Sequence, residues 1–303
     1  MKDAPQPNTI DWLSVVALGL IWGASFMSVK VALGGFGPLT VAAGRLTLAA
    51  FVLLAVVFAT GRKLPRGWSL WAFVLAFAFF SNALPFTLLN WAQQSVTSAF
   101  AGVTMASVPL FVLPLAIAFV PGERFSLLKL IGMVLGFLGV VLLLGPREIL
   151  SGSAGWAPRM ACVLAAFCYA LGGLFTRLAP AMDQIAFSAC ALALAALGMV
   201  PLALIAEGVP TMTKGQPLLA LAFLAVFPTA IATLLLVRTL RSAGPTFVTL
   251  VNFMVPLWAV IFGVVLLGEV MPEGFALATA LVLAGLAISQ GTALGRIARS
   301  IAR

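Results

Sequence analysis

The residue types that perform enzymatic chemistry are scarce in this sequence and poorly placed for it. The chain has no histidine, and its 8 Asp and Glu residues lie at or near the ends of apolar segments or between them. Acid–base and nucleophilic catalysis need a histidine, paired carboxylates or a cysteine beside a base. Cys162, Cys168 and Cys190 lie within apolar segments, where packing explains them. We therefore expect no enzyme, no metal site and no cofactor.

A different set of residues could bind a small organic solute. Four polar side chains fall near the middle of apolar segments, where an unpaired amide or hydroxyl is costly: Asn82, Thr229, Thr233 and Asn252. Helical spacing adds aromatic and methionine side chains on related faces: Trp22, Phe26, Phe86, Met105 and Tyr169. This mixture suits neutral or zwitterionic solutes. Hydrogen bonds between helices would also explain each polar residue taken alone.

Prolines lie close to these positions. Proline lacks a backbone N–H and distorts a helix, so we expect helix bends at Pro85, Pro109, Pro228 and Pro256. Because the polar residues recur in matching positions beside such bends, we favour a central substrate cavity over purely structural contacts.

The elements that carry these residues are expected to be membrane-spanning helices. Of 303 residues, 63% are hydrophobic and only 8% are charged, against about 25% charged in an ordinary soluble domain. A helix needs about 20 apolar residues to cross a bilayer. Apolar segments predict ten helices, at about 11–33, 39–60, 68–91, 96–119, 126–145, 157–178, 184–206, 217–240, 245–268 and 274–293. The chain is therefore predicted to be an all-α membrane protein, with one transmembrane domain over 1–303 surrounded by lipid.

Basic residues predict the orientation. The net charge of +9 does not indicate nucleic-acid binding, because basic residues cluster in short segments between apolar ones. If the N-terminus is cytoplasmic, that side receives Lys2, Arg62, Lys63, Arg66, Arg124, Lys129, Arg177, Arg238, Arg241, Arg296, Arg299 and Arg303. The other side receives only Lys30, Arg147, Arg159 and Lys214, while Arg45 lies within the second apolar segment. We expect both termini in the cytoplasm.

Lys30 and Arg177 are expected at the two membrane boundaries. Lys30 lies about 28 Å along a helix from Asp11, in a hydrocarbon core of about 30 Å. Its ammonium can therefore reach the lipid headgroups. Interfacial anchoring is the expected role of the pair, with contacts at a gate as the alternative.

The two halves of the chain are related. A shift of 147 residues aligns rare residue types: Trp22 with Tyr169, Lys30 with Arg177, Phe100 with Phe247 and Pro109 with Pro256. Each half holds five predicted helices, an odd number, so the second half must enter the membrane from the opposite side. We expect inverted repeats at 11–145 and 157–293, an architecture common in secondary transporters.

Longer motifs resemble a known family. The segment "IWGASF", the segment "TMASVPLFVLPLAIAFVPGERFS" and its counterpart "TLVNFMVPLWAVIFGVVLLGEVM" resemble the EamA domains of the drug/metabolite transporter superfamily. The chain looks most similar to YddG-type bacterial exporters of aromatic and other neutral amino acids. The resemblance implies export by alternating access across the bacterial inner membrane. It leaves the substrate open, since family members also carry drugs, nucleotide sugars and sugar phosphates.

The apolar segments lack the acidic and histidine residues that would indicate coupling of transport to protons. Proton coupling usually needs a carboxylate or histidine that titrates within the membrane. The sequence therefore predicts transport of a small solute, with amino acids as the first choice, that is not obligatorily proton-coupled. A multidrug or toxic-metabolite exporter and a passive solute channel remain alternatives, and a monomer is taken as the simplest assembly.

Overall fold

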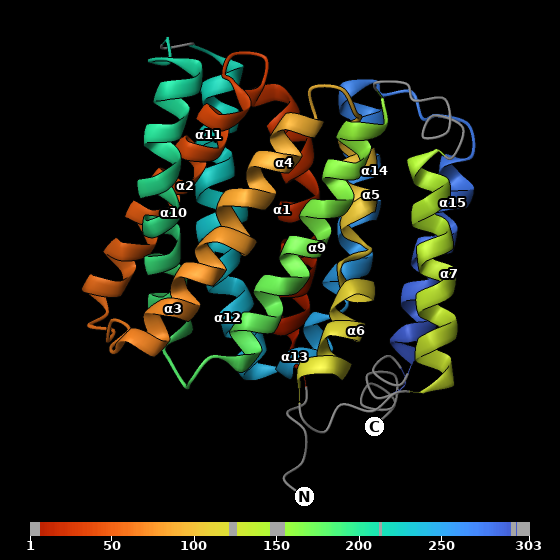
Figure 1. The fold of residues 1–303 in the computed structure, drawn as a ribbon, viewed down its shortest axis with the longest axis horizontal. Helices are drawn as coiled ribbons and strands as arrows, with labels where there is room; N and C mark the ends of the chain where they lie inside the picture. Colours follow the sequence, from red (N-terminus) through yellow and green to blue (C-terminus); the bar gives the residue numbers. More distant parts are fainter. Residues whose placement is uncertain (1–6, 121–125, 146–154, 212–213, 292–294, 296–303) are drawn as a thin grey trace, which may run out of the picture.

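The computed structural model describes residues 7–120, 126–145, 155–211, 214–291 and 295, and every regular element within them is a helix (Figure 1). The first half contains α1 (Thr9–Ala32), α2 (Pro38–Ala59), α3 (Trp68–Phe77), η1 (Ala78–Ala83), α4 (Leu84–Ala92), α5 (Ser98–Met105), α6 (Val108–Phe119) and α7 (Leu127–Leu144). The second contains α9 (Trp156–Leu178), α10 (Gln184–Glu207), α11 (Gln216–Ala225), η2 (Val226–Ile231), α12 (Ala232–Ser242), α13 (Gly244–Val248), α14 (Val251–Leu267) and α15 (Phe275–Ser289).

These elements form the predicted membrane fold. In the described residues, nine helical spans are long and apolar enough to cross a bilayer, and α15 adds a shorter tenth. Their ends lie within a few residues of the predicted ones. The spans differ from the prediction in that some are interrupted along their length, which the apolar pattern did not predict.

Polar caps fix where helices begin. The Asn8 side chain accepts from the Asp11 N–H, and the Asp11 carboxylate accepts from the Asn8 N–H, both at 3.0 Å, which forms a capping box for α1. At α10, the Asp183 carboxylate accepts from the N–H groups of Ile185 and Ala186, also at 3.0 Å. Both caps lie on the side of the bundle where α1 begins, hereafter the N side; the other side is the far side.

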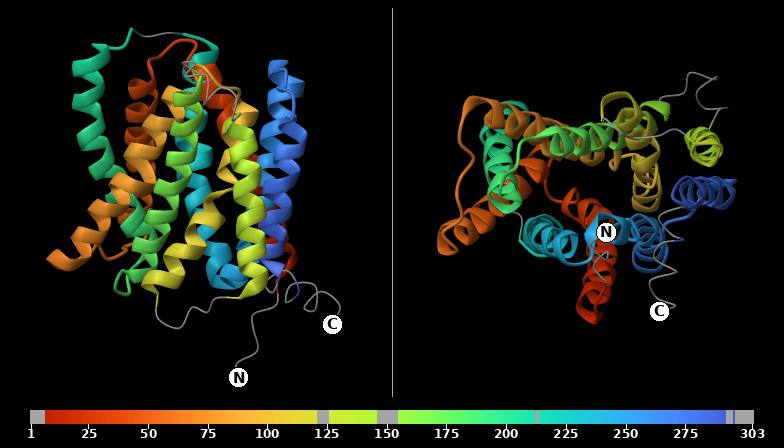
Figure 2. Two further views of the ribbon diagram at one scale, coloured as in Figure 1. Left: turned by 45° about the vertical axis from the view of Figure 1, so that its right-hand side comes forward. Right: turned by 90° about the horizontal axis from the view of Figure 1, so that it is seen from below.

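Equivalent helices of the two halves pack against each other. α2 lies along α10, and α7 lies along α15, so each pair joins the same helix of both halves. The α7–α15 pair stands at one edge of the bundle (Figures 1 and 2). With five spans in each half, α9 enters from the side opposite to α1. The architecture is thus ten helices in two inverted five-helix repeats.

The third span of each repeat contains a π-helical segment. η1 separates α3 from α4, and η2 separates α11 from α12, at equivalent positions. The fourth spans are also broken, between α5 and α6 at 106–107 and between α13 and α14 at 249–250. π-helical segments are rare and frequently occur at functional sites. The interruptions therefore mark the third and fourth spans of each repeat as candidates for the functional site.

Glycines allow the close approach of α7 and α15. A Cβ atom added at Gly285 would lie 2.3 Å from the backbone nitrogen of Gly136 and 2.5 Å from the carbonyl oxygen of Gly132. No side chain fits there without separating the two helices. Backbone contact of this kind is a frequent basis of helix association in membranes.

Replacing Gly285 by Val should therefore destabilise the protein. Overpacking costs about 1–3 kcal/mol, and a contact with backbone relaxes poorly. We expect a lower melting temperature and less monodisperse protein after heating in detergent. The matched control is Gly198→Val, because a Cβ atom at this helical glycine meets nothing within 4 Å. Equal stability of the two variants would contradict the packing role of Gly285.

Candidate functional site

The centre of the bundle holds a buried arginine. Arg45, about a third of the way along α2, is only 8% exposed. Its Nε donates a 2.8 Å hydrogen bond to Thr229 Oγ1, and its guanidinium carbon lies 3.9 Å from the centroid of the Phe86 ring. That distance is within the range of a cation–π interaction. The arginine thus joins α2 to the third spans of both repeats, a role that the sequence analysis did not assign to it.

The side chains of Asn82 in η1 and Thr229 in η2 make the same kind of hydrogen bond, to a backbone carbonyl of their own span. Asn82 Nδ2 donates to the Phe77 carbonyl at 3.2 Å, and Thr229 Oγ1 donates to the Leu224 carbonyl at 2.8 Å. Each accepting carbonyl lies five residues earlier in its own span. The two side chains therefore supply partners for carbonyls where the helical hydrogen-bond pattern changes. Thr229 uses its remaining acceptor capacity for Arg45.

Two further aromatic residues of the predicted site lie close to this centre. The Trp22 Nε1–H donates a 3.0 Å hydrogen bond to the Pro228 carbonyl, which ties α1 to η2. Tyr169 on α9 packs against both of the larger apolar clusters and lies near enough to Arg45 for the two side chains to interact electrostatically. Phe86 and Thr229 thus contact Arg45 directly, Tyr169 interacts with it electrostatically, and Trp22 binds the residue before Thr229.

The other predicted residues are placed by different contacts. Phe26 and Met105 pack into an apolar cluster that includes residues of α1, α5 and α14. Thr233 Oγ1 donates to the Thr229 carbonyl at 2.6 Å. Asn252 is half-buried, and its side chain makes no hydrogen bond to any described residue. The prolines lie in or next to interruptions or within a helix: Pro85 in the first turn of α4, Pro109 in the first turn of α6, Pro228 inside η2 and Pro256 inside α14.

Lys30 is oriented differently from the expected headgroup anchor. Its ammonium donates to the carbonyls of Gln93 at 2.6 Å and Val96 at 3.0 Å, where α4 ends. Carbonyls at a helix C-terminus lack intrahelical partners and carry partial negative charge, so they attract the cation inward. Arg177, at the end of α9 on the N side, is exposed.

Two carboxylates of the second repeat bind helix N-termini of the first on the far side. Glu207 accepts from the N–H groups of Leu39 and Thr40 at the start of α2, both at 2.8 Å. Glu269 accepts from the N–H groups of Ser98 at 2.6 Å and Ala99 at 3.1 Å at the start of α5. The exposed N–H groups and the helix dipole favour a carboxylate there. The far side is therefore held together by contacts between repeats. The sequence equivalent of Glu269, Glu123, lies outside the described residues.

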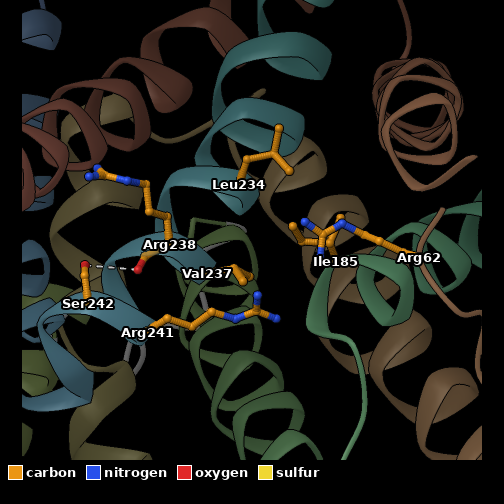
Figure 3. Close-up of a pocket in the computed structure, with 7 residues that line it drawn as sticks. All are labelled: Arg62, Ile185, Leu234, Val237, Arg238, Arg241 and Ser242. Atoms are coloured by element: carbon orange, nitrogen blue, oxygen red, sulfur yellow. Dashed lines mark hydrogen bonds between the residues drawn. The ribbon is translucent and has the colours of Figure 1, made fainter. Parts of the chain in front are cut away.

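The N side has a cleft instead. A pocket of about 380 Å³ lies between α12 and the adjoining ends of α2 and α10 (Figure 3). Leu234, Val237 and Arg241 line it from α12, with Ile185 and Arg62 on the other side. Its mouth is basic.

Asp183 is the acidic group beside this cleft. Its carboxylate accepts from Arg62 Nη1 at 2.8 Å and lies 3.9 Å from Arg241 Nη2. Burial opposes ionisation, but the backbone N–H of Ala186 and the Arg62 guanidinium outweigh it, so the pKa of this carboxyl lies below its usual range.

Metal chemistry finds no support in the described residues. No group of three His, Cys, Asp or Glu side chains there could hold a metal ion. Cys162, Cys168 and Cys190 are buried and free, which agrees with a packing role.

The family becomes clear from comparison with known proteins. The model of the EamA-like transporter family matches residues 10–145 and 158–290. The chain belongs to the EamA-like transporter family. This confirms the predicted membership of the drug/metabolite transporter superfamily. A solved crystal structure shares this EamA-type fold, with a TM-score of 0.66 over 95% of this chain and 98% of that one at 21% sequence identity.

Individual EamA relatives are distant but align over most of the chain. The uncharacterized inner membrane transporter YedA of Escherichia coli K12 is 26% identical over 86% of this chain and 84% of its own length. A probable terminal-alkyne amino-acid exporter of Streptantibioticus cattleyicolor is 26% identical over 94% of each chain. A WAT1-related chloroplast protein of Arabidopsis thaliana is also 26% identical, and this chain spans 64% of its length. The protein is thus a multi-pass membrane transporter.

The Asp183 contacts predict a pH-dependent stability. Because the pKa is lowered on folding, the carboxylate stabilises the fold above about pH 4, the usual pKa of Asp, and this contribution is lost as the pH falls through the lowered pKa. Asp183→Asn should lower the melting temperature at pH 7 by about 1–3 °C, since partly exposed ion pairs contribute little. The difference should vanish in acid. Glu273→Gln, at an exposed position, is the control; an Asp183→Asn effect that is as large at pH 2 as at pH 7 would refute the ionic origin.

Proposed function

We propose that this protein exports neutral or aromatic amino acids and related small organic solutes across the bacterial inner membrane by alternating access. The observation that carries the proposal is the pair Asn82 and Thr229, bound alike to carbonyls five residues earlier in the interrupted third spans of two inverted repeats. Transporters of this architecture place their substrate site at such interruptions between repeats. The similarity to a probable amino-acid exporter supports the choice of substrate.

The proposed substrate site combines apolar walls with a few hydrogen-bonding groups. Trp22, Phe26, Phe86, Met105 and Tyr169 supply the walls, and Asn82, Thr229, Thr233 and Asn252 supply the polar groups. Asn252 is the most available of the polar groups, because its side chain has no hydrogen-bond partner among the described residues. Such a surface accepts an aromatic or aliphatic body with a small polar end.

The proposed orientation has both termini in the cytoplasm. Described basic residues are concentrated on the N side: Arg62, Lys63, Arg66, Lys129, Arg177, Arg238 and Arg241. Lys30, Arg159 and Lys214 lie towards the far side. The positive-inside rule then makes the N side cytoplasmic. In this orientation, the far-side contacts close the periplasmic end while the cleft faces the cytoplasm, which suits loading before export.

The proposed transport is not obligatorily coupled to protons. The described carboxylates lie at helix ends: Asp11, Asp183, Glu207, Glu269 and Glu273. The chain has no histidine. Without a titratable acid at membrane depth, the solute gradient itself supplies the driving force.

Proteoliposome flux tests the function and the coupling together. Purified protein should carry net uptake of labelled L-phenylalanine into liposomes that initially contain none, with saturation, stimulation by unlabelled internal L-phenylalanine, and initial net rates that agree within about twofold with and without a pH gradient. Strict dependence on the gradient would refute the coupling proposal. Flux linear in concentration would indicate a channel, and movement of tetraphenylphosphonium without phenylalanine would indicate a multidrug exporter.

Removal of the asparagine amides tests the site. Asn252→Ala and Asn82→Ala should each lower the initial exchange rate about fivefold, the effect of one net hydrogen bond of about 1 kcal/mol. The amount of folded protein in the membrane, measured by size-exclusion chromatography after extraction, should stay constant for Asn252→Ala; for Asn82→Ala, which also loses the bond to the Phe77 carbonyl, the exchange rate is compared per amount of folded protein. Thr279→Ala on α15 is the control, since its hydroxyl donates only within its own helix. Normal exchange by both asparagine variants would remove these residues from the site.

A further inference from the structure

We propose that Arg45 binds the carboxylate group of the transported solute at the centre of the membrane, an inference that rests on the proposed transport function and specifies its substrate class. The solute would be a carboxylate or a zwitterion, and a cation without a carboxylate would be excluded. The guanidinium of Arg45 has hydrogen-bond donors without partners, it carries a charge without a described counter-charge, and it binds a residue on the same span as the cleft.

The guanidinium of Arg45 has donors to spare. Arginine carries five N–H donors, and only the Nε–H of Arg45 has a partner, Thr229 Oγ1. Neither Nη atom donates to a described residue, and neither is among the buried polar atoms sealed from solvent without a partner, unlike Arg62 Nε or the Gln93 amide. Part of the guanidinium therefore stays accessible, in line with the 8% exposed fraction of Arg45. Two parallel N–H groups match the two oxygens of a carboxylate.

The positive charge of Arg45 also lacks a counter-charge. No described Asp or Glu lies within 4.0 Å of it, and its nearest partners are the Phe86 ring and the Thr229 hydroxyl. A charged side chain at membrane depth is costly and usually pairs with an opposite charge or marks a substrate pathway. Phe86 and Thr229 hold the guanidinium in place but leave the charge uncompensated. A carboxylate supplied by the solute would complete the pair.

The surrounding residues fit the rest of such a solute. The Tyr169 phenol lies within electrostatic reach of Arg45 and can donate to a carboxylate oxygen. Trp22 is held by its hydrogen bond to the carbonyl of Pro228, the residue that precedes Thr229 in the chain. These rings offer apolar contact to the body of an aromatic or aliphatic carboxylate.

The cleft on the N side shares a span with Thr229, the hydrogen-bond partner of Arg45. Leu234 lines the cleft and follows Thr229 by five residues, a rise of about 7 Å along a helix. The cleft thus ends within about two turns of the Thr229–Arg45 contact. Arg62, Arg238 and Arg241 lie at its mouth, with Asp183 paired to Arg62 and Asp11 bound to Ser242, so the mouth keeps a small net positive charge that favours the approach of a carboxylate over that of a cation.

Competition with three related compounds tests the carboxylate requirement in the unaltered protein. Exchange of labelled L-phenylalanine in proteoliposomes is competed with 3-phenylpropionate, which has only the carboxylate, and phenethylamine, which has only the amine. We expect 3-phenylpropionate to compete and phenethylamine to be at least tenfold weaker. Equal competition by the two compounds would overturn the role of Arg45.

Two substitutions then test the residue itself. Arg45→Gln should raise the KM for phenylalanine at least tenfold and abolish the preference for 3-phenylpropionate over phenethylamine. Arg45→Lys keeps the charge without the paired donors, so an intermediate KM and a retained preference are expected. Arg177→Gln, at an exposed arginine, should match the unaltered protein. Unchanged KM and selectivity in Arg45→Lys and Arg45→Gln would refute the proposal.

Binding separates this proposal from the transport function. Thermal stabilisation of the purified protein by 3-phenylpropionate and by phenethylamine needs no transport. If phenylalanine is not exchanged but 3-phenylpropionate stabilises the unaltered protein and not Arg45→Gln, the proposed substrate fails while the carboxylate site stands. If phenylalanine is exchanged without any preference for carboxylates, the transport function stands and the role of Arg45 fails. Absence of both exchange and stabilisation refutes both.

Discussion

The contact between Arg45 and Thr229 connects more of this structure than any other single hydrogen bond described above. It attaches α2, in the first repeat, to η2, in the second. Thr229 in turn binds the Leu224 carbonyl, and the neighbouring Pro228 carbonyl binds Trp22 on α1. A charge that cannot be solvated by lipid thus draws several helices together, because only protein groups can surround it there.

Lipid cannot solvate polar backbone groups either. Within a bilayer every N–H and C=O needs a partner inside the protein, so a span can be interrupted only where other groups replace the lost hydrogen bonds. Asn82 and Thr229 do this with their own side chains, in both repeats and with the same spacing. On the far side, Glu207 and Glu269 satisfy the first N–H groups of α2 and α5. The repeats are therefore joined wherever a helix of one leaves backbone groups that the other can satisfy.

The sequence predicted the spans well because apolar length is a local property. It also singled out Phe86 and Thr229, since mid-span polar and aromatic positions stand out, and both side chains contact Arg45; their role as site residues stays a prediction. Arg45 received no role, although a lone arginine amid 22 residues of apolar helix was the signal that could have marked it.

The sequence pattern could not predict which residues far apart in the chain contact one another. Which groups meet Arg45 depends on packing across as many as 184 positions. The position of Lys30 along its helix predicted contact with the headgroups. It could not reveal the carbonyls of Gln93 and Val96, which accept hydrogen bonds from the Lys30 ammonium. Asn82, Pro228 and Thr229 stood out in the sequence of η1 and η2, but nothing in the apolar pattern predicted that the backbone there is π-helical.

The π-helical segments have a consequence for how relatives of this chain can diverge. A turn closed by hydrogen bonds to the fifth residue takes up one residue more than an α-helical turn, and one residue corresponds to about 100° of rotation. The faces that α4 and α12 present, Phe86 towards Arg45 and Leu234 towards the cleft, are therefore set by the segments that precede them. Loss of one residue from either segment would leave hydropathy and span number almost unchanged, yet would turn a different face of the helix inward. Solute preference in such proteins can thus change by a single deletion that no count of membrane spans detects.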